Sequence, residues 1–159
     1  MPFKTRVLVL ANQTADSEGL TEALRRRAAR GDVSFMLLVP VGRAGDRDAH
    51  DQLAAGLLRF AEAGLDVEGR VCDADPIVAV HESWDPGQFD EVIVSTLARD
   101  HSRWLEADLP HRIARLTDAP VEHVVPSEIE REMARRRAAR PLHHDPQRAL
   151  GPFAGPALP

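Results

Sequence analysis

The sequence has few of the residues that build disulfide frameworks and metal sites. One of its 159 residues is cysteine, which excludes an internal disulfide and any site needing several cysteines. The longest apolar stretch, around Phe35–Val41, is far shorter than the roughly 18 residues of a membrane span. Lys4 and Arg6 precede only four apolar residues, so we expect no signal peptide. We therefore predict a cytoplasmic, single-domain protein without a bound metal or a membrane partner.

Lysine is also scarce, since Lys4 is the only lysine among twenty basic residues. Such an arginine bias reflects genome composition more than a selected role, so arginine clusters carry little weight here. The formal net charge is −5, with 14 basic and 21 acidic side chains in residues 1–126 against six and four in residues 127–159. A body of this charge repels a phosphate backbone, and we expect no nucleic-acid partner.

Apolar segments alternate with helical patterns five times along the chain. The expected strands are Arg6–Leu10, Val33–Val41, Leu65–Cys72, Glu91–Val94 and Pro120–Val125. Helical spacing appears at Leu20–Ala28, Asp48–Ala63, Asp75–Trp84, Ser102–Ala107 and Asp108–Arg115. This alternation predicts an α/β fold, an open five-stranded parallel sheet with helices on both faces.

A composition change divides the chain near residue 126. Strong helix formers fill Glu128–Arg140, and frequent proline and glycine beyond it exclude regular structure. We predict an α/β domain over residues 1–126 and a C-terminal helical and irregular tail over 127–159.

Polar loops follow the first and fourth expected strands. In an open parallel sheet, ligands bind outside the carboxyl ends of the strands, where the strand order reverses. These loops contribute hydroxyl, amide and guanidinium groups suited to a polar or anionic ligand: Asn12, Thr14, Ser95, Thr96, Arg99 and Arg103. An alternative interpretation, which the residues leave open, is that these side chains cap helices and satisfy loop backbone.

Three segments resemble the universal stress protein family: Val7–Thr14 (VLVLANQT), Phe89–Thr96 (FDEVIVST) and Ala119–Val121 (APV). The resemblance covers roughly residues 5–126. It implies the strand order 3-2-1-4-5, a crevice for an adenine nucleotide such as ATP, ADP or AMP, and a homodimer through the last strand, Val121–Val125. It also places Val39 and Val41 near the base, and Asn12 where the family has an aspartate facing the adenosine.

The chain departs from the glycine-rich phosphate loop of that family. Its pattern, Gly-x-x-Gly, about nine residues, then Gly-Ser or Gly-Thr, falls on four non-glycine positions: Ser95, Ala98, Asp108 and Leu109. Glycines let backbone amides approach phosphate oxygens, whereas the Asp108 carboxylate repels them. The chain thus resembles a divergent member in which Arg99 and Arg103 contact the anion, and the nucleotide binds weakly or in an altered way.

Groups for catalysis are sparse. Asp100, His101 and Ser102 are triad residue types, but consecutive residues cannot place their side chains in a relay. We therefore predict a non-catalytic module of the stress-response type. The alternative is a dimerising interaction or scaffold domain that binds no nucleotide, its pocket closed by Trp104; a nucleotide-hydrolysing enzyme has the least support.

Overall fold

A computed structural model describes residues 3–97 and 108–127. Its strands are β1 (Thr5–Ala11), β2 (Val33–Pro40), β3 (Val67–Cys72), β4 (Glu91–Ser95) and β5 (Val121–Val124). Its helices are α1 (Glu18–Ala28), α2 (Asp46–Glu62), α3 (Pro76–Ser83) and α5 (Leu109–Thr117). The strands form one parallel sheet in the order β3-β2-β1-β4-β5. The predicted fold class and the strand order implied by the resemblance are both confirmed.

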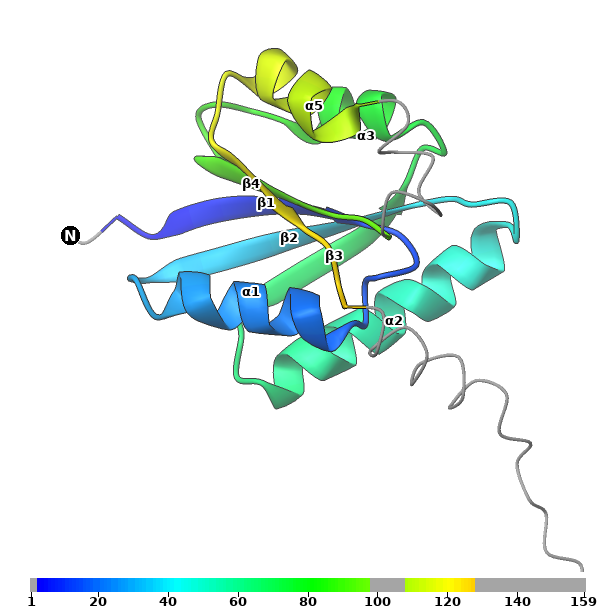
Figure 1. Ribbon diagram of the computed structural model, residues 1–159, viewed down its shortest axis with the longest axis horizontal. Coiled ribbons are helices and arrows are strands. Elements are labelled where there is room, and N and C mark those ends of the chain that lie inside the picture. The colour runs from blue at the N-terminus through cyan, green and yellow to red at the C-terminus, as the bar shows by residue number, and fades with distance from the viewer. Residues whose placement is uncertain (1–2, 98–107, 128–159) are drawn as a thin grey trace, which may run out of the picture.

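Helices cover both faces of the sheet, with α1 and α2 on one face and α3 and α5 on the other (Figure 1). Alternating side chains of the central strands divide between two apolar cores. One core joins Val9 and Leu37 to α1 and α2, and Phe60 of α2 is fully buried in it. The other joins Leu8 and Leu38 to α3 and α5. Strands buried on both faces account for the continuous apolar runs in the sequence.

Local signals fix several helix ends. Ser17 caps α1 by accepting a hydrogen bond from the Leu20 amide, and Asp75 caps α3 by accepting from the Ile77 amide. Pro76 then occupies the first turn of α3, where no amide hydrogen is needed. After α2, Gly64 takes a φ of 74°, a conformation that favours glycine.

One forked ion pair joins helix α1 to strand β4. Arg27 at the end of α1 donates from Nε and Nη2 to the two carboxylate oxygens of Glu91 at the start of β4, both at 2.9 Å. This pair fixes α1 against β4, and the Glu91 hydrogen bonds, first among the causes, raise the pKa of Arg27.

The start of α5 departs from ordinary helix capping, and other expected features lie outside the described residues. Asp108 stands at the N-cap of α5, but it adopts a left-handed φ of 52° and its side chain makes no capping hydrogen bond. The expected helix at Ser102–Ala107, the tail helix Glu128–Arg140, and Trp104 all lie outside the described residues. None of the helices in the described ranges is long and apolar enough to cross a membrane.

Candidate functional site

A pocket of about 650 Å³ lies at the carboxyl ends of the strands. It extends from the ends of β1 and β4 towards the segments that follow β2 and β3. From β1 the chain continues to β2 and β3 on one side, and later returns to β4 and β5 on the other. The pocket therefore sits where the strand order reverses, the usual ligand position in an open parallel sheet. Its walls include Asn12, Gln13, Thr14, Val41, Gly42, Arg43, Ala44, Asp48, Gln52, Ala74, Ser95, Thr96 and Leu97.

Two buried hydroxyls join the loops at the centre of this pocket. Thr14 Oγ1 and Ser95 Oγ are 2.7 Å apart, and both residues are buried. Strand pairing explains the contact, because Ala11 at the end of β1 is in register with Ser95 at the end of β4. Each hydroxyl can donate one hydrogen bond, so at most one donates to the other and one hydrogen remains for a further acceptor.

A third buried hydroxyl connects the pocket to the edge strand. Thr96 Oγ1 lies 2.7 Å from Nε2 of His123 on β5, and the Thr96 amide donates to the Val124 carbonyl. His123 is an exposed residue overall, but the partial desolvation of its ring beside buried Thr96 lowers its pKa, because removing the imidazolium from water disfavours the charged form. At neutral pH the ring is therefore uncharged and can accept the Thr96 hydroxyl hydrogen.

The side chain of Asn12 is an unused hydrogen-bonding group at the mouth of the pocket. It is partly exposed, and its amide makes no hydrogen bond to the described part of the chain. A Cβ atom built on Gly42 would lie 3.9 Å from Asn12 Nδ2, so the amide reaches across to the loop after β2. An amide in this position can donate and accept at once.

Helix α2 contributes an acidic and amide-bearing wall. Gln52 Nε2 donates to Asp48 Oδ2 at 2.7 Å, and since the carboxylate can only accept, the amide nitrogen must face it. The Gln52 Oε1 atom is buried and has no hydrogen-bond partner within the described residues. A buried acceptor without a donor is rare, and water or a ligand usually supplies the missing partner.

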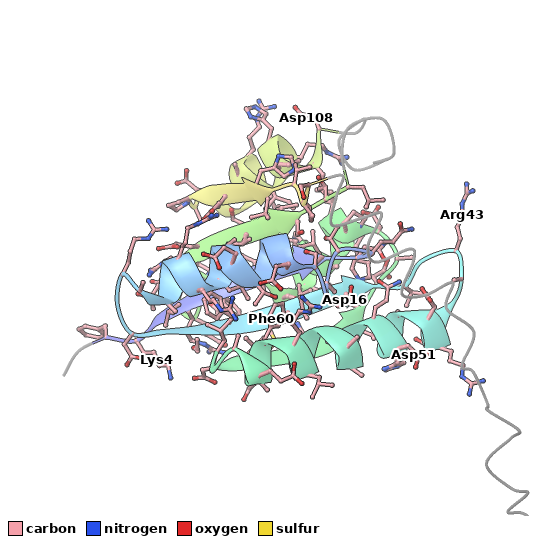
Figure 2. The ribbon with its side chains drawn as sticks, turned by 60° about the horizontal axis from the view of Figure 1, so that its bottom comes forward. Lys4, Asp16, Arg43, Asp51, Phe60 and Asp108 are labelled. Atoms are coloured by element: carbon pink, nitrogen blue, oxygen red, sulfur yellow. The ribbon has the colours of Figure 1, made fainter. Side chains whose placement is uncertain are left out.

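Charge at this wall disfavours an anion near the start of α2. Asp46 and Asp48 occupy the first turn and already complement the positive end of the helix dipole. Arg43 is the nearby cation from the preceding loop, and it is exposed and extends away from the body (Figure 2). The hydroxyl side, at the ends of β1 and β4, is therefore better suited to an anionic group, and Val41 and Ala74 give the other side an apolar surface for a flat ring.

Five of the eight residues predicted from the sequence line this pocket: Asn12, Thr14, Val41, Ser95 and Thr96. Val39 does not, because its side chain is fully buried in the core with α1 and α2. Arg99 and Arg103 lie outside the described residues.

Sequence reasoning missed the contributions of Asp48, Gln52 and His123. Asp48 and Gln52 are polar residues one helical turn apart near a helix start, and this spacing is a weak signal that could have suggested their contact. Nothing in the sequence indicated that His123 reaches Thr96, since that contact depends on the register in which Ser95 pairs with Val124.

A second, shallower groove of about 440 Å³ runs beside the edge strand. Its residues come from α1 and from β5 with the segment after it: Glu18, Gly19, Glu22, Arg26, Glu122, His123, Val124, Val125, Pro126 and Ser127. The groove lies away from the reversal of strand order, and its carboxylates are engaged by arginines of α1 and α2. His123 belongs to this groove, and its hydrogen-bond partner Thr96 belongs to the main pocket.

The described residues hold no group of three or more histidine, cysteine or carboxylate side chains that could bind a metal ion. Cys72 is half-buried, and desolvation, the largest cause, raises the pKa of its thiol to about 11. The groups that the walls of the pocket offer to a ligand include hydroxyls and amides.

Comparisons with known proteins agree with the fold. The sequence matches no protein-family model and no curated protein. Among solved structures, the chain is similar to a universal stress protein crystallised in complex with cAMP, with a TM-score of 0.58 and 21% sequence identity. The match covers 78% of this chain and 98% of that one. At this level of identity the likeness shows a shared fold.

Proposed function

We propose that the protein is a non-catalytic binding module, similar to universal stress proteins, that holds an adenine nucleotide in the pocket at the ends of β1 and β4. The observation that carries the proposal is the cluster of hydroxyl and amide groups at the reversal of strand order, formed by Asn12, Thr14, Ser95 and Thr96. The similar structure holds cAMP, which makes a nucleotide the first ligand to test.

The polarity of the pocket supports an orientation for the nucleotide. The base lies against Val41 and Ala74, on the side of β2 and β3. The phosphate lies towards Ser95 and Thr96, away from the Asp48 carboxylate. Only the one phosphate beside Ser95 and Thr96 is held in this arrangement, and the chain lacks the glycine-rich loop that would hold two more. Nucleotides with one phosphate are therefore expected to bind at least as well as ATP.

A thermal-shift panel of ATP, ADP, AMP and cAMP, confirmed by calorimetry, tests the proposal. A ligand that binds only the folded state at a hundredfold excess over its dissociation constant adds about 2.7 kcal/mol of stability. Asn12→Ala should weaken binding about fivefold, because the unused amide contributes to the ligand directly. Gln88→Ala is the matched control, since Gln88 is an exposed amide just before β4, at the other end of that strand. Absence of a shift from every nucleotide would contradict the proposal.

A second candidate function is dimerisation or partner binding through β5. This strand is an edge of the sheet, and Val125, just beyond it, is 44% exposed. Exposed edges pair readily with another strand, and a charge placed on them blocks such pairing. Light scattering of the purified protein should give the mass of a dimer, and Val125→Lys should shift it towards the monomer; a monomeric wild type would contradict this candidate.

A further inference from the structure

We infer that His123 controls the hydrogen bond that Thr96 offers to an anion in the pocket, so that anion binding is coupled to proton uptake on the edge strand. The inference rests on the proposed function and assigns a positioning role to a residue outside the pocket. The observation behind it is one hydrogen bond that joins the two sites. Thr96 lines the main pocket, and His123, its partner, lines the groove beside β5.

The burial of Thr96 favours one direction for this bond in the ligand-free protein. Thr96 is 2% exposed, so its hydroxyl needs an acceptor within the protein. Within the described residues the side-chain partner of Thr96 is His123 Nε2, 2.7 Å away. We assign to the neutral ring the tautomer with its hydrogen on Nδ1, in which the hydroxyl donates to Nε2.

Protonation of His123 reverses this bond. An imidazolium has hydrogens on both nitrogens, so Nε2–H donates to Thr96 Oγ1 and the threonine hydrogen is released. That hydrogen can then be donated to an anion in the pocket, which receives one hydrogen bond that the neutral state withholds. The ring gains one proton at Nε2, taken up from solvent, and no covalent bond other than N–H forms.

The surroundings of His123 permit such a change. On the face of the sheet that His123 shares with Val94 and Val121, α5 packs against β5 and carries His111, Arg112 and Arg115. The groove on the other side of β5 carries Glu18, Glu22 and Arg26 of α1, with Glu122 next to His123 on the strand. Each carboxylate is already near an arginine: Arg25 and Arg59 with Glu18, Arg25 with Glu22, and Arg26 with Glu122. Burial accounts for the lowered pKa of His123, so a nearby anion in the pocket can raise that pKa again.

The test measures cAMP affinity between pH 5 and 8 by calorimetry. Its phosphodiester does not titrate in this range, whereas a phosphate monoester has a pKa of about 6 and would obscure the result. Wild type should bind cAMP about fivefold to tenfold more tightly at pH 5 than at pH 8. Repetition in buffers of different ionisation enthalpy should show uptake of about half a proton for each cAMP bound at its maximum, which is the most that a tenfold coupling allows. By reciprocity, the His123 ring signal in NMR should titrate at higher pH with cAMP present.

Four variants separate this role from a structural one. His123→Gln keeps a hydrogen-bonding partner for Thr96 but cannot titrate, so its cAMP affinity should not change with pH. The affinity of Thr96→Val should also be independent of pH, because it lacks the hydroxyl, and Thr96→Ser should retain the pH dependence. His81→Gln is the matched control, since His81 is exposed on α3, which packs against β2 and α5, and its profile should equal that of wild type.

Two results would overturn the inference in different ways. Tight cAMP binding with a pH-independent affinity in wild type, or an unchanged slope in His123→Gln, would overturn the coupling and leave the proposed function standing. Absence of binding by cAMP and by every nucleotide in the panel would overturn both.

Discussion

Thr14 Oγ1 lies 2.7 Å from Ser95 Oγ, a buried hydrogen bond between positions 81 residues apart in the chain. The bond joins the loop after β1 to the end of β4, the two segments that form the centre of the pocket. Because both residues are buried, water cannot easily take the place of either hydroxyl as a hydrogen-bond partner if the other is removed. The geometry of the pocket and the stability of the fold therefore depend on the same pair of atoms.

We expect Thr14→Val to reduce the free energy of unfolding by about 1–3 kcal/mol, because it leaves the Ser95 hydroxyl buried without its partner. Thr14→Ser keeps the hydroxyl and should reduce the free energy of unfolding by less than Thr14→Val does. The double variant Thr14→Val with Ser95→Ala removes both polar groups, so its loss should be smaller than the sum of the single losses. Urea unfolding of wild type, Thr14→Val, Ser95→Ala and the double variant measures the coupling energy between the two side chains. Strictly additive losses would show that the hydrogen bond contributes little to stability.

The sequence was sufficient for most of the fold because its signals are local. Continuous apolar runs mark buried parallel strands, and Asp75 before Pro76 marks a helix start that the structure confirms. The rule that ligands bind at the ends of parallel strands also predicts that Asn12, Thr14 and Ser95 lie together, as they do in the pocket. Both successes depend on spacing along the chain.

Features that depend on contacts between distant segments could not be predicted in this way. Val39 and Val41 are alike in the sequence, yet the alternation of side chains along β2 buries Val39 in the core while Val41, beyond the strand, lines the pocket. The contacts of Gln52 and His123 depend on the rotation of α2 about its axis and on the register of β5. Neither quantity has a local signal in the sequence.

Gly56 on α2 is expected to be required for close packing under the pocket. A Cβ atom there would lie 2.9 Å from the backbone oxygen of Ala15, closer than such contacts occur. At an open helical position, glycine to alanine stabilises a protein by up to about 1 kcal/mol. Here Gly56→Ala should instead lower the melting temperature, since the backbone of the loop after β1 must move, and it should also weaken nucleotide binding. An increase in melting temperature would show that the backbone of this loop moves without a loss of stability.

Cys72 is expected to be unreactive while the protein is folded. Desolvation, only partly opposed by Arg70, raises its thiol pKa to about 11, so roughly one thiol in a thousand is ionised at pH 8. A thiol-reactive disulfide reagent at pH 8 should modify the native protein at least tenfold more slowly than the protein in urea. Equal rates in both conditions would show that the thiol is exposed and ordinary.

The lowered pKa of His123 predicts how stability depends on pH. The unfolded chain, with a histidine pKa near 6.5, takes up a proton at higher pH than the folded protein does. Above pH 6.5 both states are mostly neutral at this site and its full contribution to stability is present. As the pH falls through 6.5 towards the lower folded pKa, the unfolded state gains the proton first and stability is lost.

His123→Gln removes this titration and leaves every carboxylate in place. Urea unfolding of wild type and His123→Gln from pH 5 to 8 should give a constant difference above about pH 7. Below pH 6.5 the wild type should lose stability relative to the variant. With cAMP bound, the relative loss should shrink, because an anion near Thr96 favours the protonated ring in the folded state. Parallel curves without ligand would show that His123 has the same pKa in the folded and unfolded chain.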